Sequence, residues 1–359
     1  MASGPRVFIA GGHTYLGARL AAVCQERDFE VVCLAHEMQE PYSLQAIGVE
    51  IVRGSILEPD SFKDVLKKCD WAINLHRHID LTIPLEEEKG LSKAMNRARA
   101  EERSRARKTM KAINVDGAVN FLETCIAMDV PKVLTLSTAL AIGDHRGRLA
   151  DERFEHRRNF RSYYEKTMYD ALFHTRVKIE EGAQVACVLP GPILGPRAEG
   201  VFTQLVEDFM TGRRPWAPQS SSSMTLTYID DIVRGIFQIM DRRAPVGQYI
   251  FGNEPVTWEE FFKKLEKVSG VEAPGGWVKE GRLGSKGGAG ALPKEILPYM
   301  VDAQYKFSSE KARSQIGWDF TTMETWLAEM IEEIRSAGEG PATQAAFETF
   351  RPSSLPAGY

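Results

Sequence analysis

Short hydrophobic runs alternate with amphipathic stretches along the first half of the chain. Continuous apolar runs are typical of parallel strands buried on both faces, whereas apolar residues spaced three or four apart indicate helices. Strands are predicted over Val7–Ala10, Glu30–Ala35, Glu50–Val52, Trp71–Leu75, Val133–Leu136 and Gln184–Leu189. Helices are predicted between them over Leu16–Cys24, Ser61–Lys68, Gly117–Ala127 and Tyr164–Glu181. This alternation predicts right-handed βαβ units, and therefore an α/β fold with a doubly wound, Rossmann-like parallel sheet.

The pattern is less regular in the second half of the chain. Thr257 and Glu260 have the spacing of a capping box, which predicts a helix that runs to about Val268. Two further helices are predicted over Phe307–Trp318 and Thr322–Arg335. The glycine-rich stretch Pro274–Leu292 predicts a loop.

A chain of 359 residues is long enough for one large core and a smaller annex. We expect residues 1–196 to form a Rossmann-like nucleotide-binding domain that carries a charged insertion at about 85–111. Residues 197–335 should form mainly a smaller substrate subdomain, from which 228–250 return to the first domain. The last residues, 336–359, are rich in Gly, Pro, Ala and Thr and are expected to be an irregular tail.

Composition and charge narrow the class of protein. Hydrophobic residues make up 43% and charged residues 26%, as in ordinary globular proteins. A formal net charge of -4 argues against a protein that coats nucleic acid or an acidic membrane. The five cysteines lack any CxxC or zinc spacing and indicate a reducing compartment. Without a signal-peptide pattern or a membrane-length apolar run, the chain is expected to be soluble and cytoplasmic.

Residues 93–111 differ from the rest of the chain, with eight Lys and Arg against two Glu. Arg99, Arg103 and Arg107 repeat at every fourth position, so a helix would place them in one basic stripe. Two interpretations remain open. The stripe is either the solvated face of an insertion or a surface that binds a polyanion or an acidic partner.

The first strand leads into the turn Gly11-Gly12-His13-Thr14-Tyr15-Leu16-Gly17. A glycine-rich turn at the start of a helix lets backbone N–H groups meet a pyrophosphate. On its own such a turn is a weak signal, and the rest of the chain has to support it.

Further motifs follow in a fixed order. They are Val52-Arg-Gly54, Asn114-Val-Asp-Gly117, Leu136-Ser-Thr-Ala139, Tyr164-Glu-Lys-Thr167, Leu189-Pro-Gly-Pro-Ile-Leu-Gly-Pro196, Tyr228-Ile-Asp-Asp231, Phe307-Ser-Ser-Glu-Lys-Ala312 and Ile316-Gly-Trp318. With these motifs the chain resembles an extended short-chain dehydrogenase/reductase of the NAD-dependent epimerase/dehydratase group, over about residues 5–335. The resemblance implies a Rossmann fold, a bound NAD or NADP and a small-molecule substrate, and it is compatible with a homodimer.

In this group catalysis depends on a Ser or Thr after the fifth strand and on a Tyr-x-x-x-Lys pair. The resemblance places Thr138 at the first position, and two registers are open for the pair. Tyr164 as the tyrosine leaves Met168 at the lysine position, whereas Lys166 as the lysine leaves Ser162 at the tyrosine position. The first register also aligns the Tyr-Glu-x-Thr string and is preferred. Without the lysine a phenol keeps a pKa near 10, so only about 0.1% is phenolate at pH 7.

The resemblance also assigns the cofactor contacts, at Gly11, His13, Thr14, Tyr15, Leu16, Gly17, His36, Ser55, Asn114 and Pro190. Several of these positions depart from the family. Thr14 replaces a glycine, Ser55 replaces an aspartate, and His76 and Arg77 replace two small residues after the fourth strand. His36 supplies neither an acid for a ribose hydroxyl nor an arginine for a 2′-phosphate. We therefore expect binding of NAD or NADP to be weakened, reshaped or lost.

His76-Arg-His78-Ile-Asp80 follows the fourth strand, at the sheet edge where ligands bind in this architecture. Alternate residues of an extended segment point the same way, so His76 and His78 could share a ligand. His76 is therefore a candidate catalytic residue. No third ligand stands at a fixed spacing, so no metal site is predicted.

Three functions are compatible with these residues. The first is an NAD(P)-linked oxidoreductase or epimerase that acts on a hydroxyl or carbonyl group of a small organic molecule. The second is a cofactor-independent isomerase, lyase or cyclase in which Tyr164, Thr138 and His76 act on the substrate. The third is a non-catalytic binding or assembly protein, because a fold does not determine a function.

Overall fold

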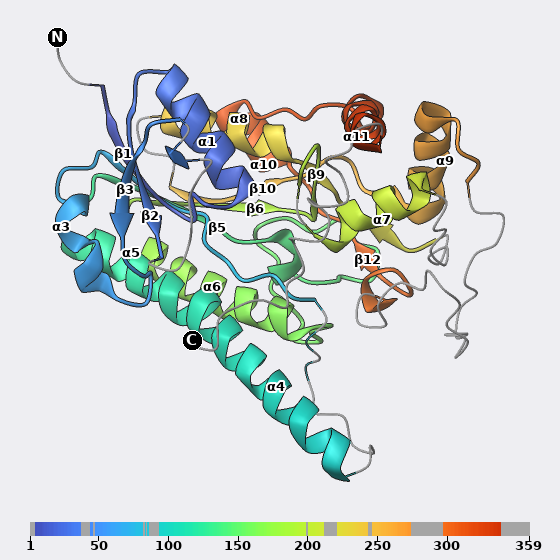
Figure 1. The fold of residues 1–359 in the computed structure, drawn as a ribbon, viewed down its shortest axis with the longest axis horizontal. Coiled ribbons are helices and arrows are strands. Elements are labelled where there is room, and N and C mark those ends of the chain that lie inside the picture. The colour runs from blue at the N-terminus through green and yellow to red at the C-terminus, as the bar shows by residue number, and fades with distance from the viewer. Residues whose placement is uncertain are drawn as a thin grey trace.

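The computed structural model describes residues 4–36, 44–45, 47–81, 83, 85, 93–198, 200–211, 221–242, 246–273 and 297–338. A seven-stranded sheet lies at its centre, with the order β10-β6-β5-β4-β1-β2-β3 and only parallel pairs (Figure 1). Its strands are β1 Arg6–Ala10, β2 Glu30–Ala35, β3 Glu50–Arg53, β4 Trp71–Asn74, β5 Lys132–Leu136, β6 Val185–Pro190 and β10 Gly247–Phe251. The predicted doubly wound, Rossmann-like α/β fold is confirmed.

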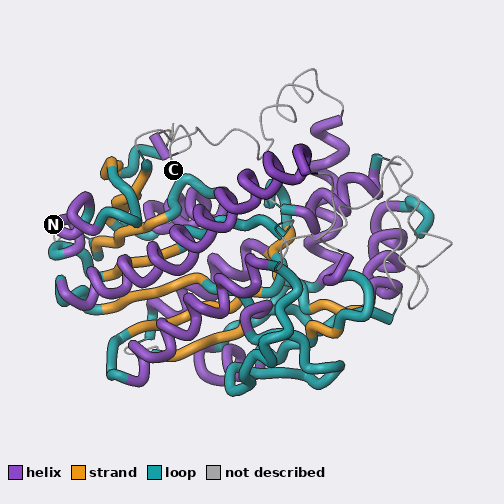
Figure 2. Tube along the Cα trace, turned by 90° about the horizontal axis from the view of Figure 1, so that it is seen from below, coloured by secondary structure: helices purple, strands orange, loops and turns teal. Residues whose placement is uncertain are grey.

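Helices cover both faces of the sheet (Figure 1). One face carries α1 (Tyr15–Glu26) and α8 (Ile229–Met240), and the other carries α3 (Lys63–Leu66), α5 (Ala118–Ala127) and α6 (Tyr163–Glu180). In Figure 2, which looks from below, helices lie along the strands.

Strand β1 shows why its residues form a strand buried on both faces. Val7 and Ile9 belong to the larger core cluster on the α1 side. Phe8 lies on the opposite side, where its ring centroid is 5.8 Å from that of Phe62 and 6.4 Å from that of Phe121. Successive residues of β1 therefore pack alternately against the two faces of the sheet. Because both faces are covered by helices, every buried residue of the strand has to be apolar.

A smaller part of the chain lies beyond the carboxyl ends of the strands. It contains α7 (Val201–Met210), α9 (Trp258–Ser269) and α11 (Met323–Gly338), whereas α10 (Glu310–Ile316) packs against β10 of the central sheet. Two small sheets accompany them, β11-β8-β12 (Val256–Thr257, Ser223–Met224, Gln304–Tyr305) and β7-β9 (Ile193–Leu194, Thr227–Tyr228). The predicted capping box of α9 is present, since Glu260 N donates to Thr257 Oγ1 at 3.2 Å and Thr257 N donates to Glu260 Oε2 at 2.9 Å.

The predicted strands are all present, with ends that differ by at most one residue. The predicted helix over Ser61–Lys68 is wrong in length, because a 3₁₀ turn at Pro59–Ser61 precedes the short α3. Helices α7 and α8 and strand β10 were not predicted. Both helices begin without a side-chain cap, so the usual sequence signal for a helix start is missing.

Residues 93–111 form the long helix α4 (Lys93–Lys111), which projects from the body of the molecule (Figure 1). A π-helical turn, Ala112–Gly117, joins it directly to α5. Within the described residues, no helix combines the length and apolarity that a membrane span requires. The predicted loop Pro274–Leu292 lies outside the described residues, as does the predicted tail 336–359 after Gly338. The start of that tail was predicted wrongly, because Ser336 to Gly338 form the end of α11.

Candidate functional site

The glycine turn after β1 brings the chain very close to the end of β4. Gly11 has a φ of +86°, and a Cβ added to it would lie 2.7 Å from the backbone nitrogen of His76. A Cβ on Gly17 would lie 2.2 Å from the carbonyl oxygen of Gly11. Neither position can hold a larger side chain without moving backbone, so the turn has the tight form that a phosphate-binding loop needs.

Thr14 is the N-cap of α1. Its Oγ1 accepts a hydrogen bond from Gly17 N at 3.1 Å and donates to Gly11 O at 2.8 Å. The side chain is thus folded back onto the turn, where it accepts a hydrogen bond from Gly17 N, one of the backbone amides at the start of the helix that lack a partner within the helix. The N–H groups of Tyr15 and Leu16, the first two residues of the helix, have no acceptor within it. Two amides at a helix N-terminus fit an anionic phosphate.

The imidazoles of His13 and His76 face each other above the turn. Their ring centroids are 5.2 Å apart and the rings are nearly perpendicular. Burial lowers the pKa of His13 to about 4 and that of His76 to about 3, so both rings are neutral at pH 7. The Nδ1 atom of His13 is buried and has no hydrogen-bond partner. A phosphate oxygen at the turn would give this atom a partner, and the residues present therefore fit the pyrophosphate of a dinucleotide.

Tyr164 and Met168 lie one helical turn apart on α6, and each side chain is about 3% exposed. Lys166 points elsewhere and pairs with Asp170, with its side chain 40% exposed. Burial raises the pKa of the Tyr164 phenol, while the positive charge of Arg77 acts in the opposite direction. The phenol is therefore protonated at neutral pH and can serve as a proton donor.

Thr138 is the second residue after β5 and is buried. Its hydroxyl donates to the carbonyl oxygen of Pro190, at the end of β6, at 3.2 Å. The Thr138 hydroxyl oxygen also accepts a hydrogen bond from Leu140 N at 3.3 Å, and this bond caps a short 3₁₀ turn at Ala139–Ala141. The structure thus brings Thr138 and Pro190 together, but the threonine hydroxyl is engaged within the fold and not with Tyr164.

Asn114 sits in the π-helical turn before α5 and is buried. Its Oδ1 accepts from His78 N at 2.7 Å, and its Nδ2 donates to His78 O at 2.9 Å and to Thr167 Oγ1 at 3.1 Å. A π turn inside a helix often marks a functional position. Here it holds the backbone after β4 against the helix that carries Tyr164.

A small polar cavity of about 20 Å³ lies beneath this arrangement, enough for about one water molecule. Its lining includes Asn114, Arg77, Ser137 and Met168. The hydroxyl of Ser137 is buried without a hydrogen-bond partner. The cavity reaches from the end of β4 to the side chain of Met168 on α6.

Two predicted cofactor contacts lie farther out, after β2 and β3. His36 follows β2, and its carbonyl oxygen accepts a hydrogen bond from Arg53 at 3.1 Å. The Ser55 hydroxyl accepts from Leu57 N at 3.2 Å, and Ser55 N donates to Ser61 at 3.1 Å. The hydroxyl and the backbone amide of Ser55 are therefore both used in hydrogen bonds within its own loop. Among the described residues, no three His, Cys, Asp or Glu side chains are arranged to hold a metal ion.

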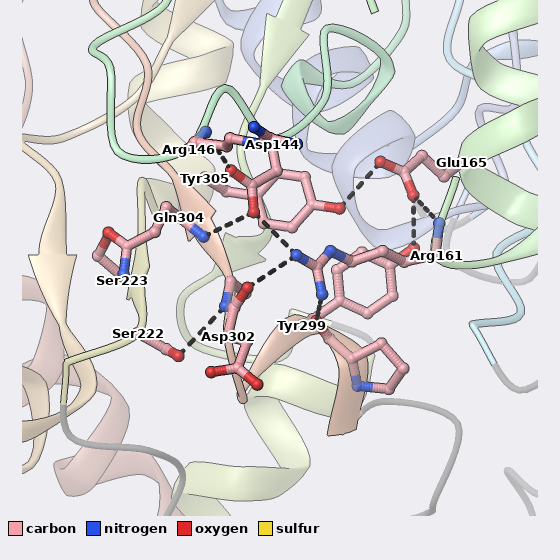
Figure 3. Close-up of polar contacts among 12 residues, drawn as sticks. Asp144, Arg146, Arg161, Glu165, Ser222, Ser223, Tyr299, Asp302, Gln304 and Tyr305 are labelled. Atoms are coloured by element: carbon pink, nitrogen blue, oxygen red, sulfur yellow. Dashed lines mark hydrogen bonds and ion pairs between the residues drawn. The ribbon is translucent and has the colours of Figure 1, made fainter. Parts of the chain in front are cut away.

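The residue after Tyr164 is the centre of a buried polar network (Figure 3). Glu165 Oε1 contacts His156 Nε2 at 3.1 Å and accepts from the hydroxyl of Tyr305 at 2.9 Å. Its Oε2 accepts from Arg161 N at 2.6 Å and from the hydroxyl of Tyr299 at 3.4 Å. Every polar atom of this carboxylate is thus satisfied inside the protein, although the side chain is fully buried.

Arg161 extends the network to the smaller part of the chain (Figure 3). It donates to Asp144 at 2.8 Å, to the carbonyl oxygen of Pro298 at 2.6 Å and to that of Asp302 at 2.9 Å. Asp144 also accepts from Gln304 N at 3.0 Å. The start of α6, which carries Tyr164, is therefore bound directly to residues 297–305.

Sequence reasoning missed the positions of Arg77 and Glu165. Arg77 was counted only as a departure from the cofactor site, and Glu165 was not singled out. A signal for Arg77 was available, because β4 and β5 are neighbours and the residues that follow them meet at one sheet edge. Nothing in the local sequence pointed to Glu165, since Tyr299 and Tyr305 come from a distant segment.

Comparisons with known proteins agree with this fold. Residues 93–251 match the model of the NAD dependent epimerase/dehydratase family. The chain is 19% identical over 350 residues to a putative dihydroflavonol 4-reductase from Synechocystis sp., covering 92% of this chain and 95% of that protein. It is 21% identical, over 93% of this chain and 98% of the relative, to a 4-hydroxy-2-methyl-3-oxo-4-farnesyl-3,4-dihydroquinoline-1-oxide ketoreductase from Stigmatella aurantiaca.

Among solved structures, the chain resembles a UDP-glucuronic acid 4-epimerase from Bacillus cereus in complex with UDP-glucuronic acid and NAD. The TM-score is 0.69 at 16% identity, over 92% of this chain and 99% of the epimerase. Over residues 93–251 the chain is thus similar to the NAD dependent epimerase/dehydratase family, and along nearly its whole length it shares the fold of the solved epimerase.

Proposed function

We propose that this protein is an NAD(P)-linked oxidoreductase that acts on a carbonyl or hydroxyl group of a small organic molecule, with ketone reduction as its main direction. The observation that carries the proposal is Tyr164, a protonated phenol beside a guanidinium at the ligand-binding edge of the sheet. The two curated relatives are named as a reductase and a ketoreductase, which favours reduction over epimerisation.

The chemistry follows from this protonation state. A nicotinamide held at this edge of the sheet would supply a hydride for the carbonyl carbon of the substrate. Tyr164 gives its phenolic proton to the carbonyl oxygen, so that one ketone, one NAD(P)H and one proton become one alcohol and one NAD(P)⁺. Solvent then returns a proton to the phenolate. At the other end of the site, the N–H groups of Tyr15 and Leu16 and the imidazole of His13 would hold the pyrophosphate.

The proposal is tested by following NAD(P)H oxidation by absorbance with a panel of aromatic and aliphatic ketones. Turnover that depends on ketone and cofactor supports it. If a substrate is converted without any nicotinamide, the second candidate, a cofactor-independent enzyme, takes its place. The observation that favours this alternative is the position of His13 and His76, whose neutral rings lie 5.2 Å apart at the glycine turn and could contact a substrate there.

We expect the purified protein to bind NAD(P)H weakly, with a dissociation constant in the high micromolar range. Thr14 occupies the amide of Gly17, Ser55 is engaged in its own loop, and Met168 cannot contact a ribose hydroxyl. Two to three lost contacts at about 1 kcal/mol each weaken binding roughly 30- to 150-fold. Isothermal titration calorimetry measures this constant. A value in the low micromolar range would contradict the prediction.

Thr14→Gly serves as the matched variant for this titration. It frees the amide of Gly17 for the phosphate and should tighten NAD(P)H binding by about fivefold, which corresponds to about 1 kcal/mol. An equal change at Thr211, whose hydroxyl bonds to Glu207 O on an exposed helix end, should leave affinity unchanged.

The rate of ketone reduction should stay level between about pH 6 and pH 9. Burial raises the pKa of Tyr164, so the proton donor remains protonated across this range. The reverse oxidation needs the phenolate, and its rate should therefore rise with pH over the same range. Initial rates in both directions give the two profiles. A reduction rate that halves near pH 7 would show that another group is the donor.

We also propose that α4 binds a polyanion or an acidic partner. Arg105 and Lys108 are exposed on this projecting helix, whereas Arg107 is half-buried, with its guanidinium 5.3 Å from the ring centre of Tyr163. The sequence-based stripe of Arg99, Arg103 and Arg107 therefore mixes a packing residue with surface charges. The side chain of Arg99 lies outside the described part of the chain.

The double variant Arg105→Ala/Lys108→Ala should weaken retention on heparin and flatten its salt dependence. Unfolding free energy should change by less than about 0.5 kcal/mol, because both charges are exposed. Arg107→Ala is the contrasting variant and should lower thermal stability, since it removes the contact with Tyr163. Unchanged heparin retention in the double variant would remove α4 from consideration as an anion site.

The cytoplasmic location and the homodimer expected from the sequence remain predictions. All five cysteines are free and buried, which suits a reducing compartment. Phe173 on α6 is 52% exposed and Ile126 on the neighbouring α5 is 40% exposed, so these helices offer apolar side chains to a second copy.

A further inference from the structure

We infer that Arg77 supplies, from the end of β4, the positive charge that this family otherwise places on α6 at the position of Met168. The inference rests on the proposed function, because it assigns a residue to the same proton transfer. It concerns a contact between two side chains of this protein, and that contact can be tested without cofactor or substrate.

The fold explains how an arginine after β4 reaches Tyr164. Strands β4 and β5 are parallel neighbours, so the segments that follow them leave the sheet side by side. Arg77 Nη1 donates to the carbonyl oxygen of Ser137, the first residue after β5, at 3.0 Å. This bond holds the guanidinium across the two strand ends. From there it lines the same cavity as Met168 of α6, and its positive charge acts to lower the pKa of Tyr164, one helical turn before Met168.

The same region contains the position that the missing lysine would occupy. Arg77, Ser137 and Met168 line one small cavity, with Asn114 at its side. The apolar side chain of Met168 fills the wall from which an ammonium group would otherwise reach the phenol. Lys166 cannot take this role, because its ammonium pairs with Asp170 near the protein surface.

A guanidinium can perform the electrostatic part of the lysine's task. It stays charged at any pH at which the protein is folded, and its five N–H groups can serve several acceptors at once. One is used by Ser137 O, which leaves others for the phenolic oxygen of Tyr164 and for a further hydroxyl. When the phenol gives up its proton, the charge stabilises the phenolate that forms.

The alternative is that Arg77 only ties the ends of β4 and β5 together. Three variants separate the two roles. Arg77→Met removes the charge, Arg77→Lys keeps it, and Arg77→Met/Met168→Lys returns it from the α6 side. Arg77→Gln, which can still donate to the Ser137 carbonyl, replaces Arg77→Met if the latter does not fold.

The first readout is the ¹³C chemical shift of Cζ in labelled tyrosine, with the Tyr164 signal assigned by its loss in Tyr164→Phe. It is measured on the protein alone, at pH 8. We expect this signal to move in Arg77→Met and to return toward its original position in Arg77→Lys and in the double variant. The second readout is steady-state ketone reduction, where Arg77→Met should lower kcat by about 10²-fold with little change in KM.

An unmoved Tyr164 signal in folded Arg77→Met or Arg77→Gln overturns the inference. So does a moved signal with kcat unchanged in an active enzyme, because the contact would then have no part in the reaction. If no ketone is reduced by the unmodified protein, the proposed function fails, while the chemical shift still decides whether Arg77 acts on Tyr164.

Discussion

Replacing Tyr164 by phenylalanine should lower kcat for ketone reduction by about 10²- to 10⁴-fold, the usual contribution of a general acid. The ring is buried and phenylalanine fills the same space, so the fold and KM should change little. The hydroxyl is the only group removed, and with it the proton that reaches the substrate oxygen. Steady-state kinetics of the two proteins at pH 7 measure the effect.

Tyr163→Phe is the matched control. Tyr163 precedes Tyr164 on the same helix, but its ring packs under Arg107 and not at the sheet edge. Its activity should stay within about twofold of the unmodified protein. If Tyr164→Phe keeps most of its activity, or if the Tyr163 variant loses as much, the tyrosine has been assigned wrongly.

The largest loss of stability is expected for Glu165→Ala. Without the carboxylate, the hydroxyl of Tyr305 and the backbone amide of Arg161 lose their acceptor inside the protein, while the hydroxyl of Tyr299 keeps its contact with Ser162. A buried donor without a partner costs about 1–3 kcal/mol, so the free energy of unfolding should fall by about 4 kcal/mol. Urea denaturation followed by circular dichroism measures this change.

Two further variants show whether the loss comes from the network. Glu165→Gln keeps an acceptor oxygen and should lose clearly less stability than Glu165→Ala. Glu259→Ala removes a glutamate that pairs with Lys263 on the surface of α9, and it should cost less than about 1 kcal/mol. Equal losses for Glu165→Ala and Glu259→Ala would mean that the buried contacts of Glu165 contribute nothing.

The sheet could be predicted because its information is local. Strands β1, β2 and β6 contain continuous apolar runs, and such a run is recognisable within a few residues. The start of α9 was recognisable for the same reason, because Thr257 and Glu260 stand three residues apart. Helix α8 was missed, since Tyr228 at its start makes no side-chain cap.

The candidate site could be predicted only in part. Motifs placed Thr138 and Tyr164 after β5 and on α6, where the structure has them. The residues that contact Thr138 and Tyr164 come from distant segments of the chain, and no local sequence pattern identifies such contacts. The Thr138 hydroxyl bonds to Pro190, and the charge beside Tyr164 comes from Arg77, which had been interpreted as a mere loss of cofactor space.

The π-helical turn at Ala112–Gly117 makes α4 and α5 one continuous rod. A π turn contains one residue more than the same stretch of α-helix, and one residue corresponds to a rotation of about 100°. The direction in which the side chains of α4 point around the helix axis therefore depends on this one additional residue. Deleting that residue would swing Arg105 and Lys108 to a different side of the molecule, and it would also shift the register of Asn114 against the backbone of His78. The orientation of α4 and the position of Asn114 therefore depend on the same turn, and a deletion in that turn changes both.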